Sequence, residues 1–225
     1  MRHKKAMIDS LNLSDNHIEA IFIRNEDYII ETVKSKSRFD PNRWCTIFGE
    51  KLKQNIIEAK IIHSYLGSIL PLKTFAVSPL RQTLEFAGLH SYNERSKLLV
   101  QSLRELKSQL DYTRVTRIDI AIDYKEEIPK TIIKALSTIR DPFRWYNTTY
   151  WKTKKEKRSN SYMDIKIYDK SLKEDLDYPL KRLEFCFKGD YFNKLILKDL
   201  GLVKNKMEKS IRKATGLTVR IEDIF

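Results

Sequence analysis

The residues best suited to chemistry lie in strand-like segments where charged and apolar side chains alternate. In Val115–Asp123 the isoleucines would point to one face of a sheet and the charged residues to the other, because successive side chains of a strand alternate. Met163–Tyr168 and Lys181–Lys188 alternate in the same way. If these strands are neighbours, one face presents three carboxylates and three cations, namely Arg117, Asp119, Asp123, Lys166, Arg182 and Glu184.

Such a face has two interpretations. Clustered carboxylate oxygens suit Mg²⁺ or Mn²⁺, which can bind a phosphate oxygen and neutralise the charge that develops on phosphorus. Alternatively, the face is a solvated, salt-bridged surface in which Asp119 pairs with Arg182. The alternation by itself leaves both interpretations open.

Tyr150 is the candidate nucleophile of the chain. A tyrosine hydroxyl needs a nearby cation or metal ion to become reactive near neutral pH. Tyr150 lies just before a basic run that could hold a DNA backbone beside it. The cations of this run are Lys152, Lys154, Lys155, Lys157 and Arg158. Tyr162 and Tyr168 are alternative nucleophiles, and packing is the commoner role of a tyrosine.

Three aromatic residues close to Tyr150 could stack on exposed bases. They are Trp145, Tyr146 and Trp151. Packing against the sheet is the alternative role for each of them.

Composition favours a polyanionic partner. The 225 residues include 43 Lys and Arg against 30 Asp and Glu, a net charge of +13 that is spread along the chain. Nucleic acid or an anionic membrane would suit such a charge. No run approaches the roughly 20 apolar residues of a spanning helix, and no signal-peptide core follows Met1, so we expect no membrane role. Cys45 and Cys186 lie in apolar runs and are expected to be reduced core residues of a cytoplasmic protein.

Apolar periodicity predicts the remaining elements. A helix should start at a capping box formed by Ser91 and Glu94, and a second helix should start at Pro129. Helical patterns also follow Asp190 and Val203, with Gly201 and Gly216 as stops, and Lys51–Leu66 has mostly helical spacing. Further strands are predicted at Arg43–Gly49, Leu80–Ala87 and Trp145–Lys152, together with a hairpin of His17–Arg24 and Tyr28–Lys34.

These elements predict a single domain over residues 1–225, of the α/β (α+β) class. Several strands follow one another through short turns, which favours a mainly antiparallel sheet with helices packed on one face. Residues 80–190 would form the catalytic core, and residues 191–225 a basic helical C-terminal part.

Four segments, in order, resemble motifs of plasmid rolling-circle replication initiators of the Rep_trans type and, more distantly, of phage replication proteins. The segments are Val115–Asp123, Thr149–Trp151, Ile167–Lys170 and Lys181–Phe185. They resemble, respectively, the family patterns R-[IL]-D-[IL]-A-x-D, T-[IL]-Y, [IV]-Y-D-K and R-[IL]-E. The chain departs from the family where Trp151-Lys152 replaces a Gly-Ser pair after the tyrosine.

The resemblance implies a replication-initiator nicking domain that cuts one strand at a plasmid or phage origin. Tyr150 would become linked to the 5′ phosphate and leave a free 3′ end. The same resemblance implies Asp119, Asp123 and Glu184 as ligands of Mg²⁺ or Mn²⁺, and Lys166 or Arg182 as phosphate contacts. Arg117, Trp151 and the basic run are then the remaining DNA-binding candidates.

The implied partners are origin DNA, a host helicase and DNA polymerase, and often a second copy of the chain. The rival interpretation is a non-catalytic DNA- or RNA-binding module that uses the same basic face. Carboxylates paired with arginines instead of a metal ion would favour the rival. Convergence of Tyr150 with Asp119, Asp123 and Glu184 within a metal's reach would support the enzyme, whereas a Tyr150 side chain on the opposite face would remove it.

Overall fold

The computed structural model describes residues 3–23, 25–34, 45–52, 56–75, 81–153 and 162–225. The strands of this part of the chain are β1 (Lys4–Asp15), β2 (Tyr28–Lys34), β3 (Cys45–Ile47), β4 (Glu50–Leu52), β5 (Ile56–His63), β6 (Ile69–Phe75), β7 (Arg81–Ala87), β8 (Arg114–Tyr124), β9 (Arg140–Trp145), β10 (Thr148–Thr153), β11 (Met163–Asp169), β12 (Lys181–Lys188) and β13 (Val219–Ile221). The helices are α1 (Ala20–Ile23), α2 (Glu94–Leu110), α3 (Lys130–Ile139), α4 (Lys170–Glu174) and α5 (Gly201–Thr215), with 3₁₀ turns at Gly189–Phe192 and Leu197–Asp199.

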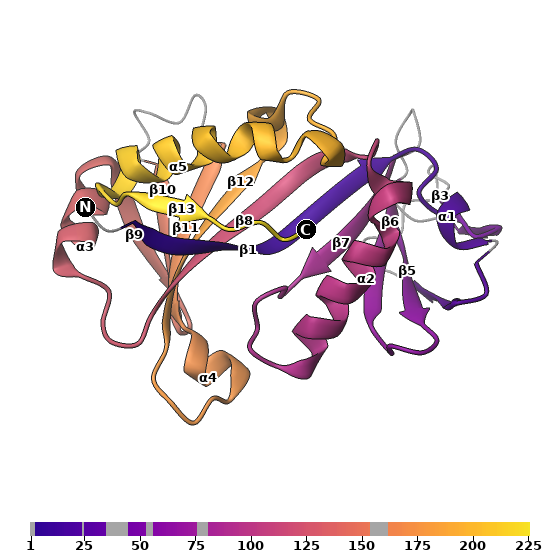
Figure 1. Cartoon of the computed structure of the whole chain (residues 1–225), viewed down its shortest axis with the longest axis horizontal. Coiled ribbons are helices and arrows are strands. Elements are labelled where there is room, and N and C mark those ends of the chain that lie inside the picture. Colours follow the sequence, from indigo (N-terminus) through magenta and orange to yellow (C-terminus); the bar gives the residue numbers. More distant parts are fainter. Residues whose placement is uncertain (1–2, 24, 35–44, 53–55, 76–80, 154–161) are drawn as a thin grey trace.

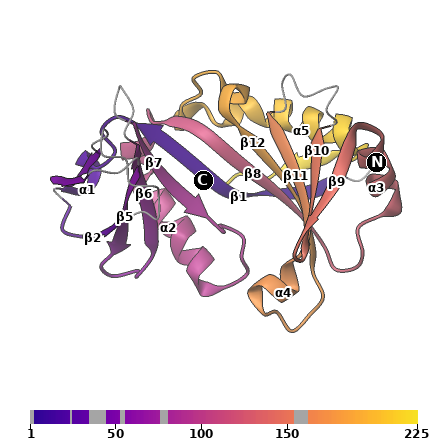
Figure 2. The same ribbon diagram turned by 180° about the vertical axis from the view of Figure 1, so that it is seen from behind.

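One large sheet organises the described part of the molecule. Its strands follow the order β2-β5-β6-β7-β1-β8-β12-β11-β10-β9, and β13 pairs with β1. Each of these neighbours is antiparallel except β13, which runs parallel to β1. Figure 1 shows α2 and α5 in front of the sheet, and Figure 2, from behind, shows the strands in front of both helices. The predicted fold class, a mainly antiparallel sheet with helices on one face, is therefore confirmed.

The apolar face of the sheet and the helices share one core. In β8 the side chains of Ile118, Ile120 and Ile122 are fully buried, as their alternation with charged residues predicts. The buried leucines of α2 and the apolar side of α5 belong to the same cluster of buried residues. The helices thus cover the isoleucine face of β8, and its charged residues lie on the opposite face.

The helix starts and stops differ from the sequence prediction in two places. The cap of α2 is Asn93, whose side chain accepts a hydrogen bond from the Ser96 amide at 2.9 Å, so the predicted capping box at Ser91 is wrong. Gly201 begins α5 instead of ending a helix, and the residues after Asp190 form only 3₁₀ turns. Gly216 does end α5, with a φ of 76° that a residue without Cβ adopts at little cost.

The predictions for three further segments differ from the structure. The described residues of Lys51–Leu66 are not helical, because alternate residues of β5 (Ile57, Ala59 and Ile61) are buried in the manner of a strand. The predicted first strand of the hairpin, His17–Arg24, contains α1 instead, and β2 pairs with β5. The predicted strand Trp145–Lys152 is divided by a turn between β9 and β10.

No helix in the described segments is long and apolar enough to cross a membrane.

Candidate functional site

The face of the sheet opposite the helices, which we call the open face, carries Tyr150 together with the carboxylates. On neighbouring antiparallel strands, residues directly opposite one another point to the same face. Tyr150 lies opposite Lys166, and Lys166 lies opposite Glu184. Strands are spaced at about 4.8 Å, so Tyr150 and Glu184 are roughly 10 Å apart across the sheet, with Lys166 between them. The face of Tyr150 is therefore the one that the enzyme interpretation requires.

A cavity of about 320 Å³ opens on this face beside Tyr150. Its lining includes three cationic side chains, those of Arg117, Lys166 and Lys188, and one carboxylate, that of Asp164, which pairs with Lys188. Tyr150 is half-buried at its wall, and the side chain of Arg117 is 41% exposed. The cavity thus combines a hydroxyl nucleophile with positive charges that suit phosphate oxygens.

Asp119 lies deep in this face and is held by Arg117. The two oxygens of Asp119 accept hydrogen bonds of 2.8 and 2.6 Å from the guanidinium group of Arg117. Burial alone would raise the pKa of Asp119, but the bonds from Arg117 outweigh it and hold that pKa below its usual range. The alternative pairing of Asp119 with Arg182 is not found.

Glu184 is buried beside Asp119 and has two partners. The ammonium of Lys166 lies 2.6 Å from one of its oxygens, and the Tyr168 hydroxyl donates a 2.9 Å hydrogen bond to the other. Burial raises the pKa of Glu184, and Lys166 offsets this only in part while the Asp119 charge adds to it. Tyr168 is a poor candidate nucleophile, because burial and the Glu184 carboxylate both raise its pKa.

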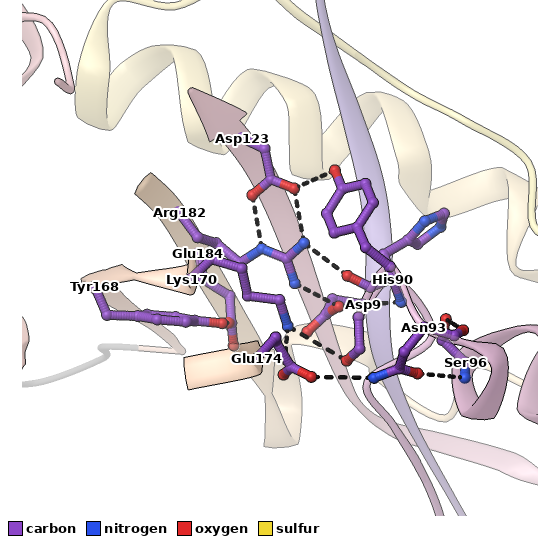
Figure 3. A network of polar contacts seen from close by, with 12 residues as sticks. Asp9, His90, Asn93, Ser96, Asp123, Tyr168, Lys170, Glu174, Arg182 and Glu184 are labelled. Atoms are coloured by element: carbon purple, nitrogen blue, oxygen red, sulfur yellow. Dashed lines mark hydrogen bonds and ion pairs between the residues drawn. The ribbon is translucent and has the colours of Figure 1, made fainter. Parts of the chain in front are cut away.

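Arg182 organises a separate network, which Figure 3 shows from close by. Its guanidinium donates two bonds of 2.7 Å to Asp123, one of 2.7 Å to Asp9 and one of 2.8 Å to the His90 carbonyl. Tyr92 also donates a 2.5 Å bond to Asp123. Asp9 reaches Arg182 from an irregularity in the pairing of β1 with β8, between Ile8 and Ser10.

The same network extends to α4. Lys170 is almost fully buried and donates to Ser91 at 3.3 Å and to Glu174 at 2.9 Å. Glu174 in turn accepts a 3.2 Å bond from Asn93, the cap of α2. The network therefore ties α4 to the loop that precedes α2.

Two predicted DNA contacts are wrong in the structure. Arg182 is fully buried with its donors engaged by protein oxygens, so it cannot reach a phosphate. Trp151 is 5% exposed and packs in the core, because its position in β10 points to the helix-covered face. Trp145 and Tyr146, by contrast, are 58% and 83% exposed.

The basic run after Tyr150 lies largely outside the described residues. This applies to Lys154, Lys155, Lys157 and Arg158, and to the side chain of Lys152. Their contact with DNA stays a prediction.

The carboxylates do not form a ligand set as they stand. Within the described residues, no three His, Cys, Asp or Glu side chains are grouped closely enough to hold a metal ion. Asp119, Asp123 and Glu184 are each neutralised by a different cation, namely Arg117, Arg182 and Lys166. A divalent ion at Asp119 and Glu184 would have to displace two ion pairs.

Sequence reasoning missed Asp9, Tyr92, Lys170 and Phe143. Asp9 had a usable signal, since it is the one acidic residue in the apolar part of β1. Lys170 also had a signal, because it is the last residue of the Ile167–Lys170 motif. Phe143 lies opposite Tyr150, and this position can be recognised only once the pairing of β9 with β10 is known.

No protein-family model matches the chain, and no curated protein sequence does so either. Among solved structures, the chain is similar to a rolling circle replication initiator protein from Geobacillus stearothermophilus. The two share 15% sequence identity over 83% of this chain and 75% of that chain, with a TM-score of 0.44.

Proposed function

We propose that this protein is a replication initiator of the rolling-circle type that cuts and rejoins one DNA strand through Tyr150. One observation carries the proposal: Tyr150 lines the same cavity as Arg117, Lys166 and Lys188. A tyrosine that attacks a phosphodiester needs cations at the phosphate oxygens, and the lining of the cavity supplies both groups.

The chemistry is a balanced transesterification. The Tyr150 oxygen attacks phosphorus, the bond from phosphorus to the 3′ oxygen breaks, and the 5′ phosphate becomes linked to the tyrosine. The tyrosine proton leaves to solvent, and the released 3′ oxygen takes up a proton. Because the new bond is also a phosphodiester, the free 3′ hydroxyl can reverse the reaction without a nucleotide cofactor. A host polymerase and helicase in the cytoplasm would extend and unwind from that 3′ end.

Lys166 has two functions in this proposal. Its ammonium neutralises the buried Glu184 and also lies on the wall of the cavity opposite Tyr150. A phosphate that enters the cavity would therefore meet a cation fixed in place by an ion pair. Arg117, held by Asp119, is fixed in the same manner.

A requirement for Mg²⁺ or Mn²⁺ stays a prediction. The carboxylates do not fit a divalent ion while Arg117 and Lys166 occupy them, and no step above depends on one. Cleavage compared in Mg²⁺, in Mn²⁺ and in excess chelator decides the point. A metal-dependent activity that Asp119→Asn abolishes would show that this carboxylate binds the ion.

The pairing of the carboxylates with cations favours the second candidate function, a non-catalytic nucleic-acid-binding module. Both candidates use the same cationic face. They differ in whether a covalent bond to DNA ever forms.

Trapping of the covalent intermediate distinguishes them. The wild-type protein is incubated, with Mg²⁺ or Mn²⁺, with single-stranded fragments tiled across the DNA that surrounds its own coding sequence. We expect an adduct that survives a denaturing gel and is absent from Tyr150→Phe, which keeps the ring and loses only the hydroxyl. Tyr162→Phe and Tyr168→Phe should still form it. If the wild-type protein forms no adduct on any fragment, the enzyme proposal fails and the binding module remains.

A further inference from the structure

The hairpin of β9 and β10 carries exposed aromatic rings beside the cavity. Phe143 lies opposite Tyr150, and Trp145 lies opposite Thr148, so both rings share the face of Tyr150. Phe143 is 45% exposed and Trp145 is 58% exposed. The strand β9 is the last one in the strand order of the described residues, so these rings stand at the edge of the sheet.

The two rings form an ordered pair. Their centroids are 6.5 Å apart and their planes differ by only 21°, so they present faces of nearly the same orientation. That separation is close to two base steps of a stacked strand, at about 3.4 Å each. Tyr146, in the turn, packs edge-on against Trp145 with centroids 5.3 Å apart and so supports it from the side.

Charge and position identify the occupant. Tyr150 lies one strand further into the sheet than the rings and Lys166 lies two strands further, so a phosphate backbone at Tyr150 would place its neighbouring bases over β9. A second copy of the chain is a poorer match, because two proteins of net charge +13 repel each other. A DNA duplex hides the faces of its bases, whereas a single strand exposes them for stacking.

We infer that Phe143 and Trp145 form a stacking platform for the bases of single-stranded DNA next to the phosphate held at Tyr150. The inference rests on the proposed function for one point, the position of the platform next to the phosphate that Tyr150 attacks. Single-strand binding itself requires no cleavage, and it can therefore be measured separately.

The test is the affinity for a fluorescent oligothymidine, measured without divalent metal, in Phe143→Ala, Trp145→Ala and the double variant. Stacking on one ring contributes about 5- to 150-fold in affinity, so each single variant should bind more weakly by a factor in that range. Trp145→Tyr should keep most of the affinity, whereas Trp145→Leu, which is apolar but cannot stack, should lose it. Affinity for a duplex should stay unchanged in every variant.

Tyr65→Ala is the matched control. Tyr65 is also a highly exposed aromatic residue, at 84%, and it lies beyond β5, near the other end of the strand order. Its removal should leave single-strand affinity unchanged. If the double variant of Phe143 and Trp145 binds oligothymidine as tightly as the wild type, the platform does not exist.

Three further outcomes separate the platform from its rivals and from the nicking proposal. A change in molar mass by light scattering, with unchanged DNA affinity, would assign the rings to contact between copies and overturn the platform. If the variants lose oligothymidine binding and the wild-type protein forms no covalent adduct, the platform is supported while the nicking proposal fails. If the wild-type protein forms the adduct and the variants bind single-stranded DNA as tightly as the wild type, the nicking proposal is supported and the platform is overturned.

Discussion

The Lys166 ammonium lies 2.6 Å from the buried Glu184 carboxylate, and Lys166 stands directly opposite Tyr150 on the next strand. One cation therefore connects the core of the polar face to the wall of the cavity. Its partner is 2% exposed, whereas the Lys166 side chain is 26% exposed. Lys166 can thus serve a bound phosphate while it neutralises Glu184.

Replacing Lys166 by methionine tests this double role. The rate of covalent adduct formation should fall by about 10²- to 10³-fold, the usual effect of removing one donor to a charge that develops in a reaction. The free energy of unfolding should also fall by roughly 1–3 kcal/mol, because Glu184 loses a charged partner in a buried position. Gel-based kinetics and urea denaturation measure the two effects.

The double variant Lys166→Met with Glu184→Gln separates them. The amide of glutamine needs no cation, so stability should largely return while the reaction stays slow. Recovery of the reaction together with stability would show that Lys166 acts only through the fold. Lys166→Arg, which keeps the charge, should retain part of both.

The pH dependence of stability should show the raised pKa of Glu184. Burial is the main cause of the rise, followed by the charge of Asp119 and opposed by Lys166. A carboxyl group whose pKa is higher in the folded than in the unfolded protein stabilises the fold fully below the unfolded value, about 4.3, and loses this contribution as the pH rises through the folded value.

The free energy of unfolding of the wild type, minus that of Glu184→Gln, should therefore decrease from pH 4 upward and then level off. Urea denaturation at half-unit pH intervals measures the difference. Parallel curves for the two proteins would contradict the raised pKa. Asp119, whose pKa is lowered, has the opposite sign and loses its contribution only as the pH falls below about 4.

The sequence was sufficient for those parts of the fold that depend on local periodicity. Strict alternation in Val115–Asp123 predicted both the strand β8 and the face of each of its side chains. The prediction of a helix at Lys51–Leu66 failed because its apolar residues fit helical spacing and strand alternation almost equally. Only the pairing of β5 with β2 and β6 decides between them.

The site was predictable to the same extent. The common face of Asp119, Glu184 and Lys166 follows from alternation once the three strands are neighbours. The choice of partners does not follow from it. Arg182 binds Asp9, 173 positions earlier in the chain, because the strand order places β1 two strands away from β12.

Arg182→Met should destabilise the protein without a direct effect on DNA binding. The change leaves Asp9 and Asp123 buried without their cation, and breaking a buried pair in this manner costs about 3–5 kcal/mol. Urea denaturation measures the loss, and DNA affinity is compared at a temperature where the variant is folded. For the stability measurement alone, Lys188→Met is the control, since the Lys188 side chain is 48% exposed and its removal should change stability by less than about 0.5 kcal/mol. Equal stability of the two variants would show that the Arg182 network contributes little.

The salt dependence of binding tests the basic run that follows β10. Each phosphate that a protein cation neutralises contributes about 0.7 to the log–log slope of affinity against salt for a single strand, and about 0.9 for a duplex. Removal of Lys154, Lys155, Lys157 and Arg158 should therefore lower the slope by about 3 if all four contact the backbone. The comparison is a variant of α5 that lacks Lys209, Arg212 and Lys213, three exposed cations of a helix that covers the opposite face of the sheet. Because DNA on the open face cannot reach α5, the slope lost per charge removed should be several times smaller in that variant. Equal losses per charge would mean that the protein attracts DNA through its net charge alone, and the open face would then have no special role in binding.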